Sequence, residues 1–437
     1  MIVSPLFAGK RYAVLGLARS GLATVDALAA SGAHVLAWDN REDARAAVAG
    51  KAEIADLLEA DLTGYDGIVV SPGVPINRHP IADKSRVSGV PLIGDIELFA
   101  LARPTLPQHR VVGITGTNGK STTTALIHHI CRNAGLPTRM GGNIGLPILA
   151  QEPLPAGGVY VLELSSYQID LTYSLDCEVA ALLNITPDHL DRYDGFAGYA
   201  ASKEQLFAMQ SDSHAAVIAV DDDPTRAIAA RLPRAITVSG TSIDTAEQLE
   251  WPSLQGPHNA QNVAVARAVA DALGIGAGGV RDALTSYSSL PHRMQIVATR
   301  GGVLYVNDSK ATNAASTAPA LSAWPAKDGR PRIHWILGGL AKSDSLDDCA
   351  VGFPNVAHAY TIGEAGPVFA AILREHVPVD ESELLVTAVQ SAAANAVPGD
   401  VVLLSPACAS FDQFRDFEAR GDAFVAIVQS LGQEAGQ

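Results

Sequence analysis

The chain has 437 residues, of which 48% are hydrophobic and 18% charged, so it can bury sizeable cores and is not intrinsically disordered. Its net charge of −15 and the lack of a basic stripe argue against a nucleic-acid-binding protein. No apolar run reaches the ~18 residues of a spanning helix, and Lys10 and Arg11 follow the first apolar residues, the reverse of a secretion signal. Four scattered cysteines indicate a reducing compartment. We expect a soluble cytoplasmic protein of roughly three domains.

The first predicted domain begins with a strand, a helix and a second strand. The strand over 11–16 ends at Gly16, a helix covers 21–30, and the next strand, over 34–38, ends in Asp39. An acid about 20 residues after a glycine turn is typical of dinucleotide-binding folds. The turn reads Gly-Leu-Ala-Arg-Ser-Gly rather than G-x-G-x-x-G, so we expect a mononucleotide diphosphate there in preference to NAD.

A third strand, over 67–70, runs into the turn Ser71-Pro-Gly-Val-Pro75. The carboxyl ends of parallel strands are where α/β sheets bind ligands, but a plain Pro/Gly turn reads the same way, and both interpretations stay open. Three strand–helix units within about 100 residues predict a small α/β domain, followed by a proline-rich linker over 102–110.

The most informative stretch lies between a predicted strand, 111–115, and a predicted helix, 123–133. Gly116-Thr-Asn-Gly-Lys-Ser-Thr122 supplies glycines that let backbone N–H groups approach phosphate oxygens, a lysine for the β and γ phosphates, and hydroxyls for Mg²⁺. The spacing departs from G-x-x-x-x-G-K-[ST], since Ile114 stands where the first glycine belongs and Gly113 comes one residue early. The strand–turn–helix context predicts an ATP site.

Two polar positions follow at predicted strand ends. Glu163 interrupts the apolar run 159–164, where a carboxylate is costly unless it is paired with a cation or bound to a metal. After a phosphate loop, Mg²⁺ binding is the simpler interpretation. His189, flanked by Asp188 and Asp191, could be a metal ligand, a general base or a structural histidine.

Two helical positions give weaker signals. Lys203 lies in a helix predicted over 199–207 and by itself reads as a solvent-exposed lysine. Asn259 and Asn262 open a helix predicted over 263–273, where they could read a nucleobase or cap the helix. From the residues alone, a role in capping the helix is favoured over contact with a nucleobase.

The remaining chain alternates strands and helices. A hairpin over 295–306 leads into Asn307-Asp-Ser-Lys-Ala-Thr-Asn313. Phe411, Phe414 and Phe417 suggest the core face of a final helix. We therefore predict an α/β protein of three domains: a Rossmann-like domain over 1–103, a P-loop mononucleotide-binding domain over 104–292, and a doubly wound, Rossmann-like domain over 293–437.

Six segments follow one another in the order of the Mur ligase family, which the chain resembles over nearly its whole length. They are Gly116-Thr-Asn-Gly-Lys-Ser-Thr122, Glu163-Leu-Ser-Ser166, Asn184-Ile-Thr-Pro-Asp-His189, Gly256-Pro-His-Asn259 with Asn262, Pro291-His-Arg293 and Asn307-Asp-Ser-Lys-Ala-Thr-Asn313. Members of this family join an amino acid to a UDP-linked cell-wall peptide. Two later segments, Leu337-Gly-Gly-Leu-Ala-Lys342 and 404–421, resemble the D-glutamate-adding members, although Ala341, Ser343, Phe411 and Arg415 depart from that pattern.

The resemblance implies an ATP-dependent ligase that joins D-glutamate to UDP-N-acetylmuramoyl-L-alanine through an acyl phosphate, in peptidoglycan synthesis and hence in cell shape and division. ATP and two Mg²⁺ ions are the implied cofactors, with Lys203 carbamylated. The implied partners are the two substrates, without nucleic acid or membrane insertion, and the chain is expected to be a cytoplasmic monomer.

The same resemblance assigns roles to single residues. Lys120, His189 and Lys203 would be catalytic, and the metal ligands would be Ser121, Glu163, His189 and Lys203. ATP would be bound by Gly116, Thr117, Asn118, Gly119, Lys120, Ser121, Thr122, Asn259, Asn262, Arg293 and Asp308. The UDP-sugar and its peptide would contact Leu17, Ala18, Asn40, Arg41, Ser71, Gly73 and Asn143, and D-glutamate would contact Lys310, Thr312, Lys342, Ser410 and Phe417.

Two other function classes remain alternatives. A P-loop switch or chaperone-type ATPase would hydrolyse ATP without any acceptor. An NAD-dependent oxidoreductase built from the first and third domains would leave Lys120 without a role.

Overall fold

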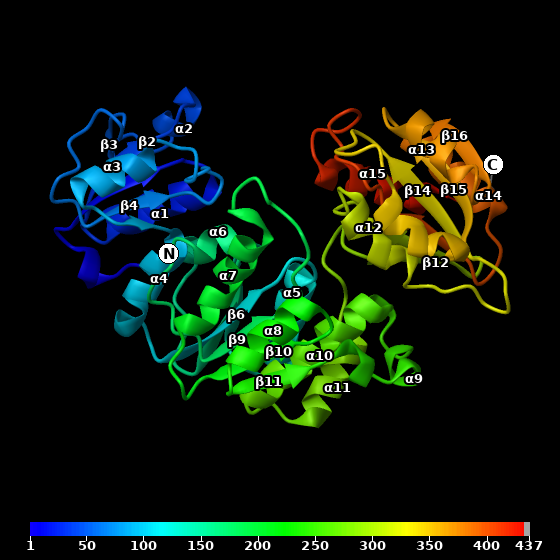
Figure 1. The fold of residues 1–437 in the computed structure, drawn as a ribbon, viewed down its shortest axis with the longest axis horizontal. Helices are drawn as coiled ribbons and strands as arrows, with labels where there is room; N and C mark the ends of the chain where they lie inside the picture. Colours follow the sequence, from blue (N-terminus) through cyan, green and yellow to red (C-terminus); the bar gives the residue numbers. More distant parts are fainter. Residues whose placement is uncertain (432–437) are drawn as a thin grey trace. The chain divides into compact units, whose positions relative to one another are not determined.

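The computed structural model describes residues 1–431 and contains three β-sheets, each with its own helices (Figure 1). The chain divides into two compact units. One consists of Met1–Ser239 with Ala264–Ala283, and the other of Gly240–Val263 with the segment from Leu284 onward. The first unit holds two of the sheets and the second unit holds the third.

The first sheet is parallel and has the strand order β3-β2-β1-β4-β5. Its strands are β1 (Arg11–Leu15), β2 (His34–Trp38), β3 (Glu53–Ile54), β4 (Gly67–Val70) and β5 (Leu92–Ile93). Its helices are α1 (Arg19–Ala30), α2 (Glu42–Ala46), α3 (Ile81–Ser88) and α4 (Asp95–Ala102). The strand order reverses between β1 and β4, and such a switch point leaves a crevice at the carboxyl ends of the two strands.

The central sheet is also parallel, in the order β11-β10-β9-β6-β8-β7. Its strands are β6 (His109–Thr115), β7 (Thr138–Gly142), β8 (Gly158–Glu163), β9 (Val179–Leu182), β10 (Ala215–Ala219) and β11 (Ala235–Val238). The connecting helices include α5 (Lys120–Asn133), α6 (Ser166–Ile169), α7 (Gly195–Ala208) and α8 (Asp223–Arg231). Every residue of β8 and β9 is buried, as expected of strands covered on both faces.

Apolar packing joins the first two sheets within the first unit. Phe99 on α4 packs edge-on against Tyr160 on β8, with the ring centroids 5.1 Å apart. Both belong to one buried cluster that contains side chains from both sheets. Burial of two large aromatic side chains stabilises this packing.

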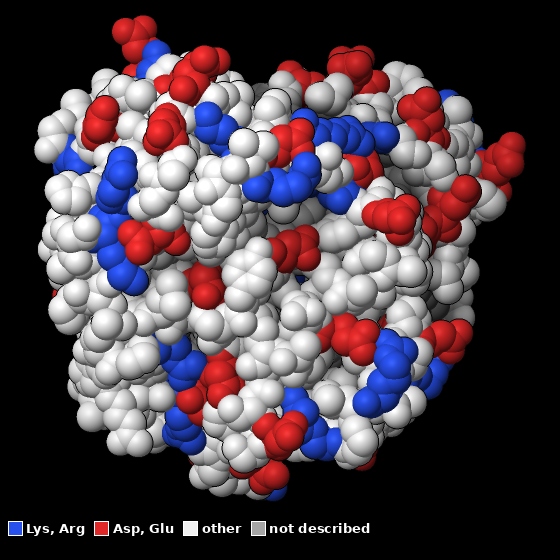
Figure 2. Space-filling model, turned by 60° about the vertical axis from the view of Figure 1, so that its left-hand side comes forward, with Lys and Arg blue, Asp and Glu red and all other residues white. Residues whose placement is uncertain are grey.

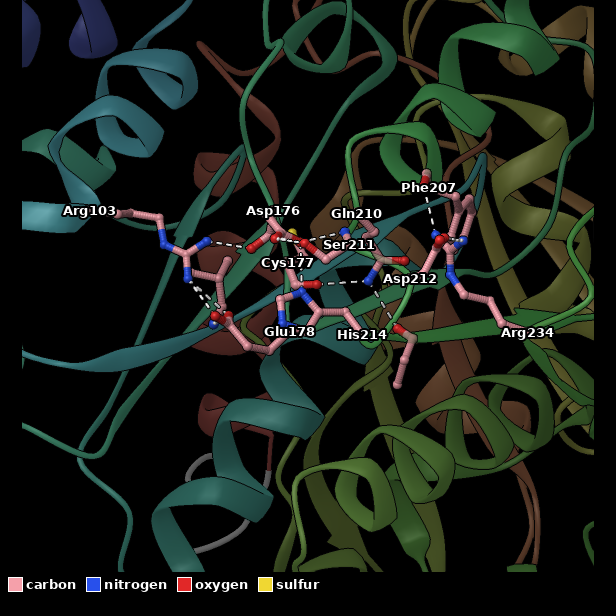
Figure 3. A network of polar contacts seen from close by, with 12 residues as sticks. Arg103, Asp176, Cys177, Glu178, Phe207, Gln210, Ser211, Asp212, His214 and Arg234 are labelled. Carbon is pink, nitrogen blue, oxygen red and sulfur yellow. Dashed lines mark hydrogen bonds and ion pairs between the residues drawn. The ribbon is translucent and has the colours of Figure 1, made fainter.

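A polar network fixes the chain where it enters the central sheet (Figure 3). Arg103, just after α4, donates to both carboxylate oxygens of Glu178, at 2.8 and 3.0 Å, and to the carbonyl of Asp176. The Asp176 carboxylate in turn contacts His214 Nδ1, at 2.7 Å, and accepts from Ser211. Arg103 precedes β6, while the other members of the network precede β9 or β10. All of them therefore lie at the end of the strands opposite to the loop after β6. The network therefore holds the sheet and leaves that loop to bind ligands.

The third sheet has the order β12-β13-β17-β14-β15-β16, in which β12 and β13 form an antiparallel hairpin and the other pairs are parallel. Its strands are β12 (Gln295–Arg300), β13 (Val303–Asn307), β14 (Ile333–Gly338), β15 (Val356–Ile362), β16 (Val379–Glu383) and β17 (Val401–Leu404). The helices of the second unit include α12 (Ala314–Leu321), α13 (Gly366–Leu373), α14 (Leu385–Asn395) and α15 (Phe417–Ser430). Between the central and third sheets the chain forms α9 (Thr245–Gln248), α10 (Pro257–Ala272) and α11 (Ala277–Ser286).

The three sheets confirm the predicted α/β fold, and two helix predictions are wrong. Helix α10 begins at Pro257, so Asn259 and Asn262 lie inside it and do not cap it. Helix α15 begins at Phe417, and Phe411, in the preceding turn, is 68% exposed and therefore not part of the core. The positions of the domain boundaries stay a prediction.

Acidic and basic side chains are interspersed on the face that Figure 2 shows. Anionic small molecules can still bind, because local N–H groups and single cations hold them whatever the net charge. None of the helices described in residues 1–431 combines the length and apolar character that crossing a bilayer requires.

Candidate active site

The loop after β6 has the shape of a phosphate cradle. Gly116 adopts φ 150°, and a Cβ there would lie 2.9 Å from the Leu183 side chain. Gly119 is the N-cap of α5, in the left-handed region at φ 83°, and it offers no side chain to cap the first turn. Asn184, after β9, fixes the loop, since its carbonyl and its Oδ1 accept from the N–H groups of Thr117 and Asn118, each at 2.8 Å. Phosphate oxygens can accept hydrogen bonds from the N–H groups at such a helix start.

Two lysines meet at this loop. Lys120 Nζ donates to the carbonyls of Gly116, at 3.0 Å, and Thr117, at 2.8 Å. Lys203 Nζ, from α7, donates to the same Gly116 carbonyl at 2.8 Å. The structure thus brings together two of the three residues predicted to be catalytic.

Lys203 is buried, which contradicts its interpretation from sequence alone as a solvent-exposed lysine. Only 1% of the residue is exposed, and its Nζ lies 4.5 Å from the centroid of the Tyr199 ring. Burial, together with the positive charge of Lys120, lowers the pKa of Lys203 to about 7, against the opposing influence of Asp188 and Asp170. The side chain is therefore poised to lose its proton near neutral pH.

Glu163, the last residue of β8, presents one unused oxygen. Its Oε1 accepts from Asn143 Nδ2 at 2.9 Å, while Oε2 is buried and has no hydrogen-bond partner in the described chain. The backbone beside it is tightly fitted, because a Cβ on Gly142 (φ 85°) would lie 2.1 Å from the Glu163 carbonyl oxygen. A buried carboxylate oxygen without a donor is costly, and a bound cation would remove that cost.

The other predicted metal ligands lie at the same edge of the sheet. Ser121 is buried in the first turn of α5. His189 follows β9 with a left-handed backbone (φ 51°), a half-exposed side chain and its ring 5.2 Å from that of Tyr167. Non-glycine residues adopt this conformation at a cost, and such residues are concentrated at functional sites.

The turns after β1 and β4 line a cavity of about 290 Å³ at the switch point of the first sheet. Ser71 Oγ donates to the Gly16 carbonyl at 2.7 Å, and Asp39 accepts from the N–H groups of Leu17, at 2.7 Å, and Arg41, at 2.9 Å. Burial acts to raise the pKa of Asp39, but these two backbone bonds and the guanidinium of Arg41 together lower it below its ordinary value. Of the residues predicted to contact the UDP-sugar, Asn40 and Gly73 line this cavity and Ala18 is the N-cap of α1.

The remaining predicted ATP ligands lie in the second unit. Asn262 Nδ2 donates to Asn259 Oδ1 at 3.0 Å, and both side chains are buried on α10. Asp308 accepts from Ser405 Oγ, at 2.8 Å, and from the Met294 N–H, at 3.1 Å. Burial raises the pKa of Asp308 to about 7. Within the second unit, Asn259 and Asn262 are thus joined to each other, and Asp308 is held by two donors.

The predicted D-glutamate contacts lie on loops at the carboxyl ends of three neighbouring strands. Lys310 and Thr312 follow β13, Lys342 follows β14 and Ser410 follows β17, in a sheet where β17 lies between β13 and β14. Lys310 Nζ lies 3.9 Å from the centroid of the Phe417 ring. Parallel strands bring their carboxyl ends to one edge, so these residues share an edge.

Arg420 is a buried cation that sequence reasoning missed. It is 1% exposed, on α15, and donates to the carbonyls of Ser309 and Cys408, each at 2.9 Å, and to Ser309 Oγ at 3.0 Å. Ser309 precedes Lys310 and Cys408 lies two residues before Ser410. Arg420 therefore ties together two of the loops that carry predicted D-glutamate contacts.

Three family models match successive parts of the chain. The "Mur ligase MurD-like, N-terminal domain" matches residues 10–94, the "Mur ligase middle domain" matches 114–267, and the "Mur ligase, glutamate ligase domain" matches 292–408. The UDP-N-acetylmuramoylalanine–D-glutamate ligase of Novosphingobium aromaticivorans is 66% identical over 435 residues, which cover 99% of this chain and 97% of the relative. The chain belongs to the Mur ligase family. As a Mur ligase it is an enzyme, and the resemblance seen in its motifs is confirmed.

Other Mur ligases extend this result. The UDP-N-acetylmuramoylalanine–D-glutamate ligase of Sphingopyxis alaskensis is 59% identical over 99% of this chain and 100% of the relative. A crystal structure of a UDP-N-acetylmuramate–alanine ligase from Thermotoga maritima aligns with a TM-score of 0.58 at 15% identity, covering 96% of this chain and 99% of that one. The Thermotoga structure shows that the three-domain fold is shared. The Sphingopyxis relative shows that the chain resembles the D-glutamate-adding branch of the family.

Proposed function

We propose that this Mur ligase joins D-glutamate to UDP-N-acetylmuramoyl-L-alanine and uses ATP to activate the alanyl carboxylate as an acyl phosphate. The observation that carries the substrate assignment is the 66% identity, over 99% of the chain, to a relative named for that reaction. A carboxylate is a poor acyl donor because oxide would have to leave. Transfer of the γ-phosphoryl group to the carboxylate replaces that leaving group with phosphate.

The first step brings a carboxylate up to a triphosphate, and the two anions repel each other. The N–H groups of the first turn of α5 and the ammonium of Lys120 are proposed to bind the phosphates and reduce this repulsion. Phosphate oxygens would then replace the carbonyls of Gly116 and Thr117 as acceptors of the Lys120 protons.

Lys203 is proposed to act as a carbamate. The neutral amine attacks CO₂, an N–C bond forms, one C=O π bond opens to an oxyanion, and a proton leaves the nitrogen for solvent. Only unprotonated lysine can react in this way, and a pKa of about 7 leaves about half of the side chain neutral at pH 7. The product is an anionic, oxygen-bearing side chain in place of a cation.

Ser121, Glu163, His189 and carbamylated Lys203 are proposed to hold two Mg²⁺ ions. The unpartnered Oε2 of Glu163 and the hydroxyl of Ser121 are the oxygen ligands that Mg²⁺ prefers. Bound Mg²⁺ supplies positive charge to the phosphate and carboxylate oxygens. Within residues 1–431 no three His, Cys, Asp or Glu side chains form one metal-binding group, so the proposal depends on the hydroxyl and the carbamate as further ligands.

In the second step the neutral amine of D-glutamate attacks the carbonyl carbon of the acyl phosphate. The amide C–N bond forms, the C–O bond to the leaving phosphate breaks, and the nitrogen loses a proton to solvent. Lys310 and Lys342 offer two ammonium groups for the two carboxylates of D-glutamate, with Thr312, Ser410 and Phe417 beside them. We also propose that the chain works as a cytoplasmic monomer, as the family resemblance implies. Light scattering of the purified protein and fractionation of cells would test these two parts.

A phosphate-release assay across a panel of amino acids tests the proposal. Phosphate should appear only when ATP, UDP-N-acetylmuramoyl-L-alanine and D-glutamate are all present, and L-glutamate, L-lysine and L-alanine should not replace D-glutamate. Release at the full rate without an acceptor would instead support the P-loop ATPase alternative. Preference for another amino acid would overturn the substrate assignment and leave the ligase chemistry standing.

A further inference from the structure

The loop that carries His189 is attached to the first sheet. It lies between β9 and α7, in the central sheet. Within it the Arg192 N–H donates to the His189 carbonyl at 2.9 Å, which closes a turn. The Arg192 side chain extends out of this turn, and its Nη2 donates at 3.0 Å to the carbonyl of Val74, which follows β4. Arg192 thus joins the His189 turn to another sheet of the same unit.

The acceptor of this hydrogen bond is itself held in place. Val74 lines the cavity at the switch point of the first sheet, and its N–H donates to the Ser71 carbonyl at 3.0 Å. Ser71 Oγ in turn donates to the Gly16 carbonyl at 2.7 Å. The carbonyl that Arg192 contacts therefore belongs to the hydrogen-bonded pair of turns that is proposed to bind the UDP-sugar.

An aromatic side chain supports both the arginine and the histidine. The guanidinium carbon of Arg192 lies 4.1 Å from the centroid of the Tyr167 ring, and the His189 ring lies 5.2 Å from the same ring. Arg192 and Tyr167 are both half-buried. A cation over an aromatic face is attracted to it, and more strongly where water is partly excluded. The guanidinium therefore has a fixed place beside the histidine.

His189 needs such support. Its side chain is 49% exposed, and its backbone is left-handed at φ 51°. A non-glycine residue keeps this conformation only where the surrounding structure imposes it. The hydrogen bond from the Arg192 N–H, anchored through the Arg192 side chain to a second sheet, is a constraint of that kind.

Two other side chains contact the same loop and differ from Arg192 in burial. Asn77 Nδ2 and Arg78 Nη2 donate to the Asp191 carbonyl, at 3.1 and 2.9 Å. Both donors and Asp191 are exposed, and the Arg78 guanidinium lies 4.0 Å from the Asp191 carboxylate. Exposed contacts of this kind contribute little to stability. Arg78 is therefore a matched control for Arg192.

We propose that Arg192 is a positioning residue for His189: it anchors the His189 turn to the turn after β4, so that the first sheet sets the place of a metal ligand in the central sheet. The inference rests on the proposed function, which makes His189 a ligand of Mg²⁺. Groups that orient a metal ligand typically account for about 10–100-fold in metal affinity. The domain proposed to bind the sugar nucleotide thereby also organises the metal site.

Mn²⁺ affinity, measured by electron paramagnetic resonance in a bicarbonate buffer that maintains the proposed carbamate on Lys203, tests the proposal. Arg192→Ala should lower the affinity by about tenfold, and Arg192→Lys, which keeps a charge and a donor, should lower it less. In a His189→Gln background Arg192→Ala should cause no further loss, because the arginine then has no ligand to position. Arg78→Ala should stay within about twofold of the wild type. The Kd for UDP should be unchanged in every variant.

Four results would decide against the proposal. Wild-type Mn²⁺ affinity in Arg192→Ala, or an equal loss that persists in the His189→Gln background, would overturn the positioning role and leave the proposed function intact. A parallel loss of UDP affinity in Arg192→Ala would show that the arginine supports the turn after β4 and not His189. Wild-type Mn²⁺ affinity in His189→Gln alone would overturn the proposed role of His189 as a metal ligand, and this inference with it.

Discussion

Lys120 and Lys203 donate hydrogen bonds to the same atom, the carbonyl oxygen of Gly116, at 3.0 and 2.8 Å. Two ammonium groups on one carbonyl repel each other, and the more buried one, Lys203, loses its proton more readily. The lysine proposed to bind phosphate thus favours the neutral form of the lysine proposed to carry the carbamate. Phosphate binding by Lys120 and carbamate formation on Lys203 are therefore electrostatically coupled, because one backbone oxygen holds the two ammonium groups close together.

Lys120→Met should abolish ligation and leave the UDP-sugar site intact. We expect the rate of phosphate release to fall by about 100-fold or more, as for loss of a charge that stabilises a transition state. The Kd for UDP should stay within about twofold, because the cavity after β1 and β4 does not include this loop. Calorimetry with UDP and steady-state kinetics measure the two effects. Loss of both phosphate release and UDP binding in this variant would contradict the assignment of ATP and the UDP-sugar to separate sites.

The carbamate on Lys203 should depend on pH in a defined direction. The pKa of Lys203 is lowered from its ordinary value near 10.5 to about 7, so the reactive neutral amine is abundant above pH 7 and is lost as the pH falls below it. At a fixed concentration of dissolved ¹³CO₂, the carbamate carbon signal in NMR should be strong at pH 8 and weak at pH 6. Lys203→Ala should show no signal and no activity, and short-chain carboxylic acids should partly restore its activity. A signal that persists in this variant would assign the carbamate to another residue.

Asn143→Leu should weaken metal binding. The Asn143 amide donates to Glu163 Oε1 and thereby orients the unpartnered Oε2. Loss of such an orienting partner typically lowers metal affinity by about 10–100-fold, so we expect a loss of at least about tenfold. Mn²⁺ affinity, measured by electron paramagnetic resonance, should fall accordingly. If Mn²⁺ binds normally and the UDP-sugar binds weakly, Asn143 is a substrate contact, as the family resemblance implies, and not a support for Glu163.

Arg420→Lys should raise the KM for D-glutamate selectively. Lysine cannot reproduce the several N–H donors that reach Ser309 and Cys408, so the loops bearing Lys310 and Ser410 lose their common anchor. We expect the KM for D-glutamate to rise about tenfold, the effect of losing charged hydrogen bonds, with the KM values for ATP and UDP-N-acetylmuramoyl-L-alanine within about twofold. Arg415→Lys, an exposed arginine five residues earlier, is the matched control. Equal losses for all three substrates would indicate a folding defect.

Motif order predicted the family correctly, and the loop over 116–119 lies between a strand and a helix as expected, because the chemistry of the family constrains neighbouring residues there. The burial of Lys203 was not predictable in the same way, since its acceptor, Gly116, lies 87 residues away in the chain. A weak local signal existed: Lys203 lies four residues after Tyr199 and four before Phe207, and both are buried on the same face of α7.

In the third domain a local spacing pattern predicted a structure that does not form. Phenylalanines spaced by three residues predicted a helix, but the turn before α15 continues past Phe411, because Asp416 begins the helix by accepting the N–H of Ala419 at 2.7 Å. Arg420 was overlooked although it lies on the stripe between Phe417 and buried Phe424. A cation on an apolar stripe is a sign of buried carbonyl acceptors, and those come from segments that spacing alone does not bring together.

The most direct test of the proposed mechanism follows one oxygen atom. UDP-N-acetylmuramoyl-L-alanine labelled with ¹⁸O in the alanyl carboxylate is incubated with the protein, ATP and D-glutamate, and the released phosphate is analysed by mass spectrometry. An acyl phosphate intermediate predicts one ¹⁸O atom in each phosphate, formed together with one ligated product and only in the presence of D-glutamate. Unlabelled phosphate, or phosphate released at the full rate without D-glutamate, would contradict it.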